Sequence, residues 1–183
     1  MAFKVAVIVG SLRKASYSRK LAHVLAALAP DNLALDIVEI GGLPLYDEDE
    51  EGRQPAWTAF REQVAPTDAV LFVTPEYNRS IPGCLKNALD VGSRPYGHSV
   101  WSGKPGAVVS NSPGLIGGFG ANHHLRQCLV FLNVPVLQQP EAYVSKVAEL
   151  MDEQGQIIKD ESKAYLAQFM TVFGAWVERI RAG

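Results

Sequence analysis

The chain has 183 residues, of which 48% are hydrophobic and 20% are charged, which allows a folded domain with a substantial core. The formal net charge of -2 and the lack of any long basic run exclude a general nucleic-acid binder. No segment reaches the ~18 consecutive apolar residues of a membrane helix. We therefore expect one domain over residues 1–183, with no nucleic-acid partner and no membrane partner.

The first residues and the two cysteines indicate the compartment. The start of the chain, MAFKVAVIVGSLRK, carries its positive charges inside and after the apolar run, so we interpret it as a core strand rather than a secretory signal. Cys84 and Cys128 lie in apolar helical patterns without metal-ligand spacing, as expected of buried thiols in a reducing compartment. The sequence therefore predicts a cytoplasmic protein.

Apolar runs alternate with helical patterns along the chain. The expected strands are 3–9, 33–40, 69–74, 106–112 and 134–137. The expected helices are 18–28, 56–64, 85–91, 122–132 and 163–181, and the segment 152–160 is expected to form a turn or short hairpin. This alternation predicts an α/β fold, a flavodoxin-like three-layer sandwich around a five-stranded parallel sheet of order 2-1-3-4-5.

Ligands of such sheets bind beyond the carboxyl ends of the strands, where the strand order reverses. This rule selects the loops 10–18, 75–83 and 111–120, all rich in glycine, proline or small polar residues. The first loop reads GSLRKASYS and lacks both the spaced glycines of a dinucleotide site and the lysine of a nucleoside-triphosphate loop. Its hydroxyls and arginine suit a terminal phosphate monoester, and they belong to Ser11, Arg13, Ser16 and Ser18.

Two other interpretations of the first loop stay open. Ser16 or Ser18 could cap the following helix while Arg13 remains a solvated charge. A cysteine-dependent phosphatase is disfavoured, because Ser11 stands where its nucleophile would be and no closing arginine follows Cys84.

The second loop belongs to the stretch TPEYNRSIPGCLKNALD, residues 74–90. Tyr77 offers a π-surface with a polar tip to a flat aromatic ligand, and Asn78 offers a donor and an acceptor to a heteroaromatic edge. The alternatives are an exposed loop aromatic at Tyr77 and a solvated acid at Glu76.

Four stretches together resemble the NADPH-dependent FMN reductase family, which includes chromate- and quinone-reducing flavoproteins. They are GSLRKASYSRKLA, PLYDED, TPEYNRSIPGCLKNALD and GLIGG followed by HLRQCLVFL. The resemblance spans about Val5 to Leu137. It implies a flavodoxin-like fold, non-covalently bound FMN, and assembly as homodimers or homotetramers.

The resemblance also implies roles for individual residues. The FMN phosphate would be held by Ser11, Arg13, Ser16 and Ser18. The isoalloxazine would be lined by Pro75, Glu76, Tyr77 and Asn78. Its pyrimidine edge or other flank would be approached by Ser110, Gly114, Gly117 and Gly118. Family members often carry asparagine at the position of Ser18 and an arginine soon after the paired glycines, where this chain reads GGFGA.

The expected function is an FMN-dependent NAD(P)H oxidoreductase with no dedicated catalytic side chain. NADPH or NADH would reduce the flavin, and a quinone, chromate, an azo compound or a free flavin would then take two electrons in a ping-pong cycle. The alternative is a non-catalytic FMN electron carrier of the flavodoxin type, although the modest net charge and the loop arginine both favour the enzyme. A reductase that delivers reduced flavin to a partner is a third possibility.

Further polar clusters are not expected to bind metal. Adjacent helical residues point ~100° apart, so His123 and His124 should serve packing or a subunit interface rather than share an ion. The acidic residues 47–51 are expected to form a solvated loop. Contacts between subunits are expected at 43–46 and 85–91.

Overall fold

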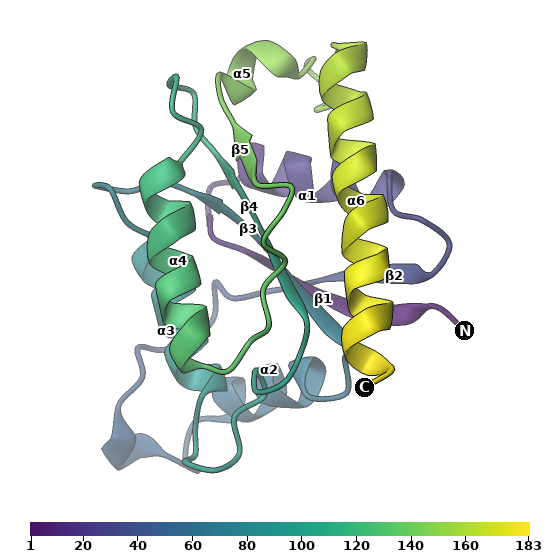
Figure 1. The fold of residues 1–183 in the computed structure, drawn as a ribbon. Coiled ribbons are helices and arrows are strands. Elements are labelled where there is room, and N and C mark those ends of the chain that lie inside the picture. The colour runs from purple at the N-terminus through teal and green to yellow at the C-terminus, as the bar shows by residue number, and fades with distance from the viewer.

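The computed structural model describes residues 1–183, and its strands form one parallel sheet of order β2-β1-β3-β4-β5 (Figure 1). The strands are β1 (Phe3–Val9), β2 (Leu33–Val38), β3 (Ala69–Pro75), β4 (Gly106–Asn111) and β5 (Ala142–Val144). The helices are α1 (Tyr17–Ala27), α2 (Pro55–Val64), α3 (Gly83–Gly92), α4 (Phe119–Phe131), α5 (Val147–Leu150) and α6 (Asp160–Arg181), with a 3-10 turn η1 at Glu48–Glu50. The predicted fold class and strand order are confirmed.

The central strands are apolar on both faces because each face is covered by helices. Odd-numbered residues of β1, such as Val5 and Val7, pack in a cluster with α1 and α6. Even-numbered residues, Ala6 and Ile8, pack in a second cluster with α2, α3 and α4. This alternation is the two-residue period of a strand, and it produces the three layers of the fold.

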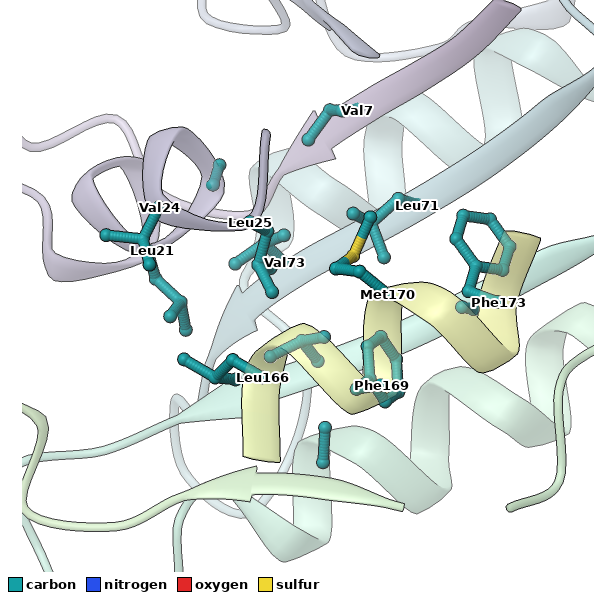
Figure 2. Packing of buried hydrophobic residues seen from close by; sticks show 14 of the residues in the cluster. Val7, Leu21, Val24, Leu25, Leu71, Val73, Leu166, Phe169, Met170 and Phe173 are labelled. Atoms are coloured by element: carbon teal, nitrogen blue, oxygen red, sulfur yellow. The ribbon is translucent and has the colours of Figure 1, made fainter. Parts of the chain in front are cut away.

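Helix α6 supplies the largest side chains of the first cluster. Figure 2 shows Leu166, Phe169, Met170 and Phe173 of this helix lying against β1, β3 and α1. Their spacing of three and four residues places them on one stripe, as an amphipathic helix requires. None of the helices combines the length and apolar character needed to cross a membrane.

The fifth strand was predicted wrongly at 134–137. There, Val136 forms a single parallel bridge with Gly106, and the regular ladder to β4 begins only at Ala142, which pairs with Val109. Pro135 has no N–H to donate to a ladder, so the segment cannot continue as a regular strand. The chain therefore reaches the edge of the sheet as predicted but pairs there five residues beyond the predicted run.

The remaining boundaries differ less. Helix α4 begins at Phe119, three residues before the predicted start, because Gly118 adopts a left-handed φ of 78° and turns the chain into the helix. The short hairpin expected at 152–160 is confirmed by an antiparallel bridge between Met151 and Ile157.

The packing of α6 predicts the cost of a cavity. The change Phe173→Ala removes a fully buried ring and should lower the free energy of unfolding by about 3–5 kcal/mol. Urea denaturation followed by circular dichroism measures this loss. Thr171→Ala, on the exposed face of the same helix, is the control and should change stability by less than about 0.5 kcal/mol. Equal effects of the two changes would contradict this account of the core.

Candidate functional site

Three loops meet beyond the carboxyl ends of β1, β3 and β4. The register pairs Thr74 with Ser110 and Pro75 with Asn111, so the loops after β3 and β4 begin side by side. They enclose, with the β1–α1 loop, a cavity of about 220 Å³. It is lined by Ser11, Arg13, Ser16, Tyr17, Ser18, Pro75, Glu76, Tyr77, Asn111, Ser112 and Pro113. The cavity thus lies where the strand order reverses, as ligand sites of open parallel sheets do.

The β1–α1 loop and the first turn of α1 contribute hydroxyl groups to the cavity wall, and we call this part of the wall the hydroxyl end. Ser11, Ser16 and Ser18 are all buried, and each lines the cavity. The Nδ2 atom of Asn111 donates to Ser18 Oγ at 2.9 Å and to the Thr74 carbonyl at 3.2 Å. Asn111 therefore joins the end of β4 to the first turn of α1 and to the end of β3, and it fixes the Ser18 hydroxyl.

The sequence analysis did not select Asn111. Its signal in the sequence was weak: it is the second of two polar residues that end the run GAVVSN. The structure places it in register with Pro75, the first residue of the PEYN segment.

Ser16 has a structural task as well as a place in the cavity wall. It is the N-cap of α1, and its Oγ accepts the Arg19 N–H at 3.1 Å. The capping interpretation is therefore correct for Ser16, whereas Ser18 lies inside the helix and bonds to Asn111. The first turn of α1 contains no acidic residue, so the partial positive charge of the helix start is not neutralised from within.

Arg13 is the one cation of the cavity wall. Its side chain is exposed, and it forms none of the ion pairs of the structure. A free guanidinium, three hydroxyls and the start of a helix form a donor set suited to a phosphate dianion. The residues present therefore fit the phosphate of a mononucleotide.

The cysteine-dependent phosphatase interpretation has no support in the geometry. No cysteine lines the cavity. Burial raises the pKa of the Cys84 thiol and of the Cys128 thiol, so neither is activated as a nucleophile.

The second loop forms a tight turn beside the cavity. Tyr77 and Ser80 exchange two backbone hydrogen bonds of 2.9 Å, and Asn78 and Arg79 have φ values of 51° and 65°. Positive φ at both central residues is the requirement of a type I′ hairpin turn, and asparagine tolerates it well. Tyr77 lines the cavity and is half-exposed, whereas Asn78 occupies the turn and does not line the cavity.

Glu76 is not the solvated acid that one interpretation of the sequence proposed. Its side chain is 12% exposed and lines the cavity. The carboxylate accepts the backbone N–H of Ala121 at 3.1 Å and lies 3.5 Å from the Arg79 guanidinium. It therefore connects the second loop to the start of α4.

The third loop reaches the cavity through Ser112 and Pro113. The four residues selected from the family resemblance, Ser110, Gly114, Gly117 and Gly118, do not line the cavity. A Cβ on Gly117 would lie 2.7 Å from the Tyr143 carbonyl carbon, and one on Gly118 would lie 3.0 Å from the Ser110 Cβ. Because both residues also have positive φ, they allow this loop to pack closely on β4 and β5.

Ser110 and Gly114 complete this packing. Ser110 is fully buried, and its hydroxyl accepts from Asn122 Nδ2 at 3.2 Å. The Gly114 N–H donates to Ser112 Oγ at 3.0 Å, and its carbonyl accepts from the Lys146 N–H.

The two adjacent histidines have separate partners. His123 Nε2 lies 2.8 Å from the Tyr143 hydroxyl, and His124 Nδ1 lies 2.5 Å from Ser80 Oγ. Burial raises the pKa of Tyr143 to about 12, so its hydroxyl stays protonated.

No group of three or more histidine, cysteine, aspartate or glutamate side chains is placed to hold a metal ion.

The acidic stretch 47–51 is only partly solvated. Glu51 pairs with Arg61 through two hydrogen bonds of 2.6 and 2.8 Å, and its side chain is 22% exposed. These bonds lower the pKa of Glu51. The prediction of a solvated loop is therefore wrong for Glu51, which fastens the loop before α2 onto that helix.

Comparison with known proteins agrees with this geometry. A family model described as NADPH-dependent FMN reductase matches residues 3–149. A quinone reductase from Pseudomonas putida is 61% identical over 182 residues, covering 98% of this chain and 97% of the relative. A 2-hydroxy-1,4-benzoquinone reductase from a Burkholderia species is 49% identical over 178 residues, with 97% of each chain covered.

A solved structure has the same fold throughout. The flavoenzyme FerB from Paracoccus denitrificans, an NAD(P)H:acceptor oxidoreductase, has a TM-score of 0.92 at 40% identity and covers 97% of this chain and 98% of its own. The family match over most of the chain and the high identity of full-length relatives lead to one conclusion: the chain belongs to the NADPH-dependent FMN reductase family.

Proposed function

We propose that this chain is an FMN-dependent NAD(P)H:quinone oxidoreductase formed by one domain over residues 1–183. The observation that carries the proposal is the cavity at the reversal of strand order, whose wall combines the hydroxyl groups and Arg13 of the β1–α1 region with Pro75, Glu76 and Tyr77 of the segment at the end of β3. The quinone reductase names of full-length relatives support the same activity.

The phosphate of FMN would lie at the hydroxyl end. Ser11, Ser16 and Ser18 would present their hydroxyls, and the start of α1 would present N–H groups that have no partner within the helix. Arg13 would add a charge-assisted hydrogen bond from an exposed position. Asn111 would act indirectly by holding Ser18.

The isoalloxazine ring would lie toward the second and third loops. Pro75, Glu76 and Tyr77 would form one wall, with Asn78 holding the adjacent turn. Ser112 and Pro113 would form the neighbouring wall. We propose that the third-loop residues selected from the resemblance serve this wall by shaping its backbone; they are Ser110, Gly114, Gly117 and Gly118.

FMN supplies the redox chemistry when bound: it accepts a hydride from NADPH or NADH and returns two electrons to the acceptor. The protein's contribution is placement. Its titratable groups at the cavity are Arg13, Tyr17, Glu76 and Tyr77, and none is a histidine poised for proton transfer. Tyr77 lines the cavity and is half-exposed, and we propose that nicotinamide and acceptor approach the flavin beside it in turn.

Several finer features belong to the same proposal. Quinones are the acceptors that the names of several relatives give, and chromate, azo compounds and free flavins are further candidate acceptors. We propose a cytoplasmic homodimer or homotetramer. The assembly is supported by exposed apolar side chains: Leu45 is 80% exposed, and Phe131, which lines one hollow with Tyr46 and Leu89, is 90% exposed. A single monomeric species in size-exclusion chromatography would contradict the proposed homodimer or homotetramer.

The activity itself is tested with the FMN-loaded protein, a nicotinamide cofactor and benzoquinone. Oxidation of NADPH or NADH should require the quinone, and initial rates at several quinone concentrations should give the parallel double-reciprocal lines of a ping-pong cycle. Intersecting lines would contradict a shared route. Bound FMN without nicotinamide oxidation would establish the non-catalytic carrier instead.

The phosphate end is tested by Arg13→Ala. Loss of one hydrogen bond from a charged group should weaken FMN binding by about 10- to 100-fold, measured by quenching of flavin fluorescence. Thermal unfolding of the FMN-free protein should be unchanged, because Arg13 has no partner in the fold. Lys14→Ala removes a neighbouring exposed cation that does not line the cavity and should leave the FMN affinity within about twofold. Equal losses in the two variants would contradict a specific role for Arg13.

A further inference from the structure

Glu76 is the only carboxylate among the residues that line the cavity. A carboxylate at 12% exposure loses most of its hydration and therefore needs compensating partners. A second negative charge is unexpected in a cavity that we propose to bind a phosphate. The hydrogen-bond and ion-pair partners of Glu76 show how its carboxylate is accommodated.

The two carboxylate oxygens bond to different parts of the fold. Oε2 accepts the Ala121 N–H in the first turn of α4, where the N-cap residue Gly118 has no side chain to do so. Oε1 lies 3.5 Å from Nη1 of Arg79, the second central residue of the hairpin turn. Glu76 thus supplies a cap that α4 lacks and ties it to the turn.

Gly120 makes this arrangement possible. A Cβ at this position would lie 2.9 Å from Glu76 Oε2 and 2.9 Å from the Arg79 carbonyl oxygen. Any larger residue would push the carboxylate or the turn away from α4. Because Gly120 has no side chain, the Glu76 carboxylate can lie against α4 in the cavity wall.

The two members of the ion pair differ greatly in exposure. Arg79 is 76% exposed, so water and salt screen its positive charge, whereas Glu76 is mostly shielded. The pair therefore leaves a net negative potential on the cavity side. Negative charge near a flavin opposes the addition of electrons to it, so it lowers the reduction potential.

From this geometry we propose that Glu76 sets the reduction potential of the bound flavin and that Arg79 opposes it from the solvent side. The inference rests on the proposed function, because it requires FMN in this cavity. Glu76 makes the reduced flavin a stronger electron donor to the acceptor. Arg79 moderates this effect and makes it dependent on ionic strength.

The test is the midpoint potential of bound FMN in Glu76→Gln and Arg79→Gln, measured by equilibration with a reference dye. Glutamine at 76 keeps an oxygen to accept the Ala121 N–H but loses the charge. We expect Glu76→Gln to favour binding of reduced over oxidised FMN by about tenfold relative to the unchanged protein, which is a rise of about 30 mV for a two-electron couple. Arg79→Gln should lower the potential by a smaller amount.

Ionic strength provides a second readout. The shift caused by Arg79→Gln should shrink at high salt, because this side chain is exposed, whereas the shift caused by Glu76→Gln should persist. Arg181 and Asp68 form an ion pair that does not line the cavity and lies outside the proposed subunit contacts, so Arg181→Gln and Asp68→Asn are matched controls. Both should leave the potential unchanged.

A purely structural role would give a different pattern. Both variants would then weaken FMN binding and move the potential in the same direction or not at all, and either result would overturn the inference. If the unchanged protein binds no FMN, the proposed function fails and this inference fails with it. If it binds FMN and oxidises NAD(P)H while the Glu76 and Arg79 variants keep its potential, only this inference fails.

Discussion

Parallel pairing of β1 with both β2 and β3 is the constraint on which the rest of the molecule depends. From β1 the chain continues to β2 on one side of the sheet, whereas β3, β4 and β5 follow on the other side. The loops after β1 and β3 therefore lead in opposite directions and leave a space between them at the carboxyl ends of these strands. The helices then bury both faces of the sheet in two separate clusters. The strands hold the starting points of the loops, and the loops carry the residues that line the cavity.

The cavity residues depend on bonds between loops as much as on the loops themselves. Asn111 joins the end of β4 to Ser18 and to the end of β3, and Glu76 joins the second loop to α4. Gly117 lets the third loop approach the backbone of Tyr143, and Gly120 lets α4 approach Glu76 and the Arg79 carbonyl. These contacts support the division that we propose, in which the hydroxyl groups would anchor the phosphate of the cofactor and the shielded carboxylate would tune its ring.

Local patterns were sufficient for the fold and for the first loop. Both features have patterns that can be read along the sequence. The continuous apolar run of β3 indicates a strand buried on both faces, and the serines near the start of α1 indicate a loop of hydroxyl groups at a helix start. The fifth strand was misplaced because the apolar character of 134–137 was given more weight than Pro135, whose missing N–H can be read from the sequence. Asn111 and the cap from Glu76 to Ala121 were missed because their partners are 93 and 45 residues away in sequence. Such contacts appear only when the strand register is known.

The central claim is that the hydroxyl end of the cavity holds the phosphate of FMN. The most direct measurement compares the affinity of the flavin-free protein for FMN and for riboflavin, which differ only in that phosphate. The account predicts that FMN binds at least about 100-fold more tightly, because the phosphate forms several charge-assisted hydrogen bonds. Equal affinities for the two flavins would contradict it.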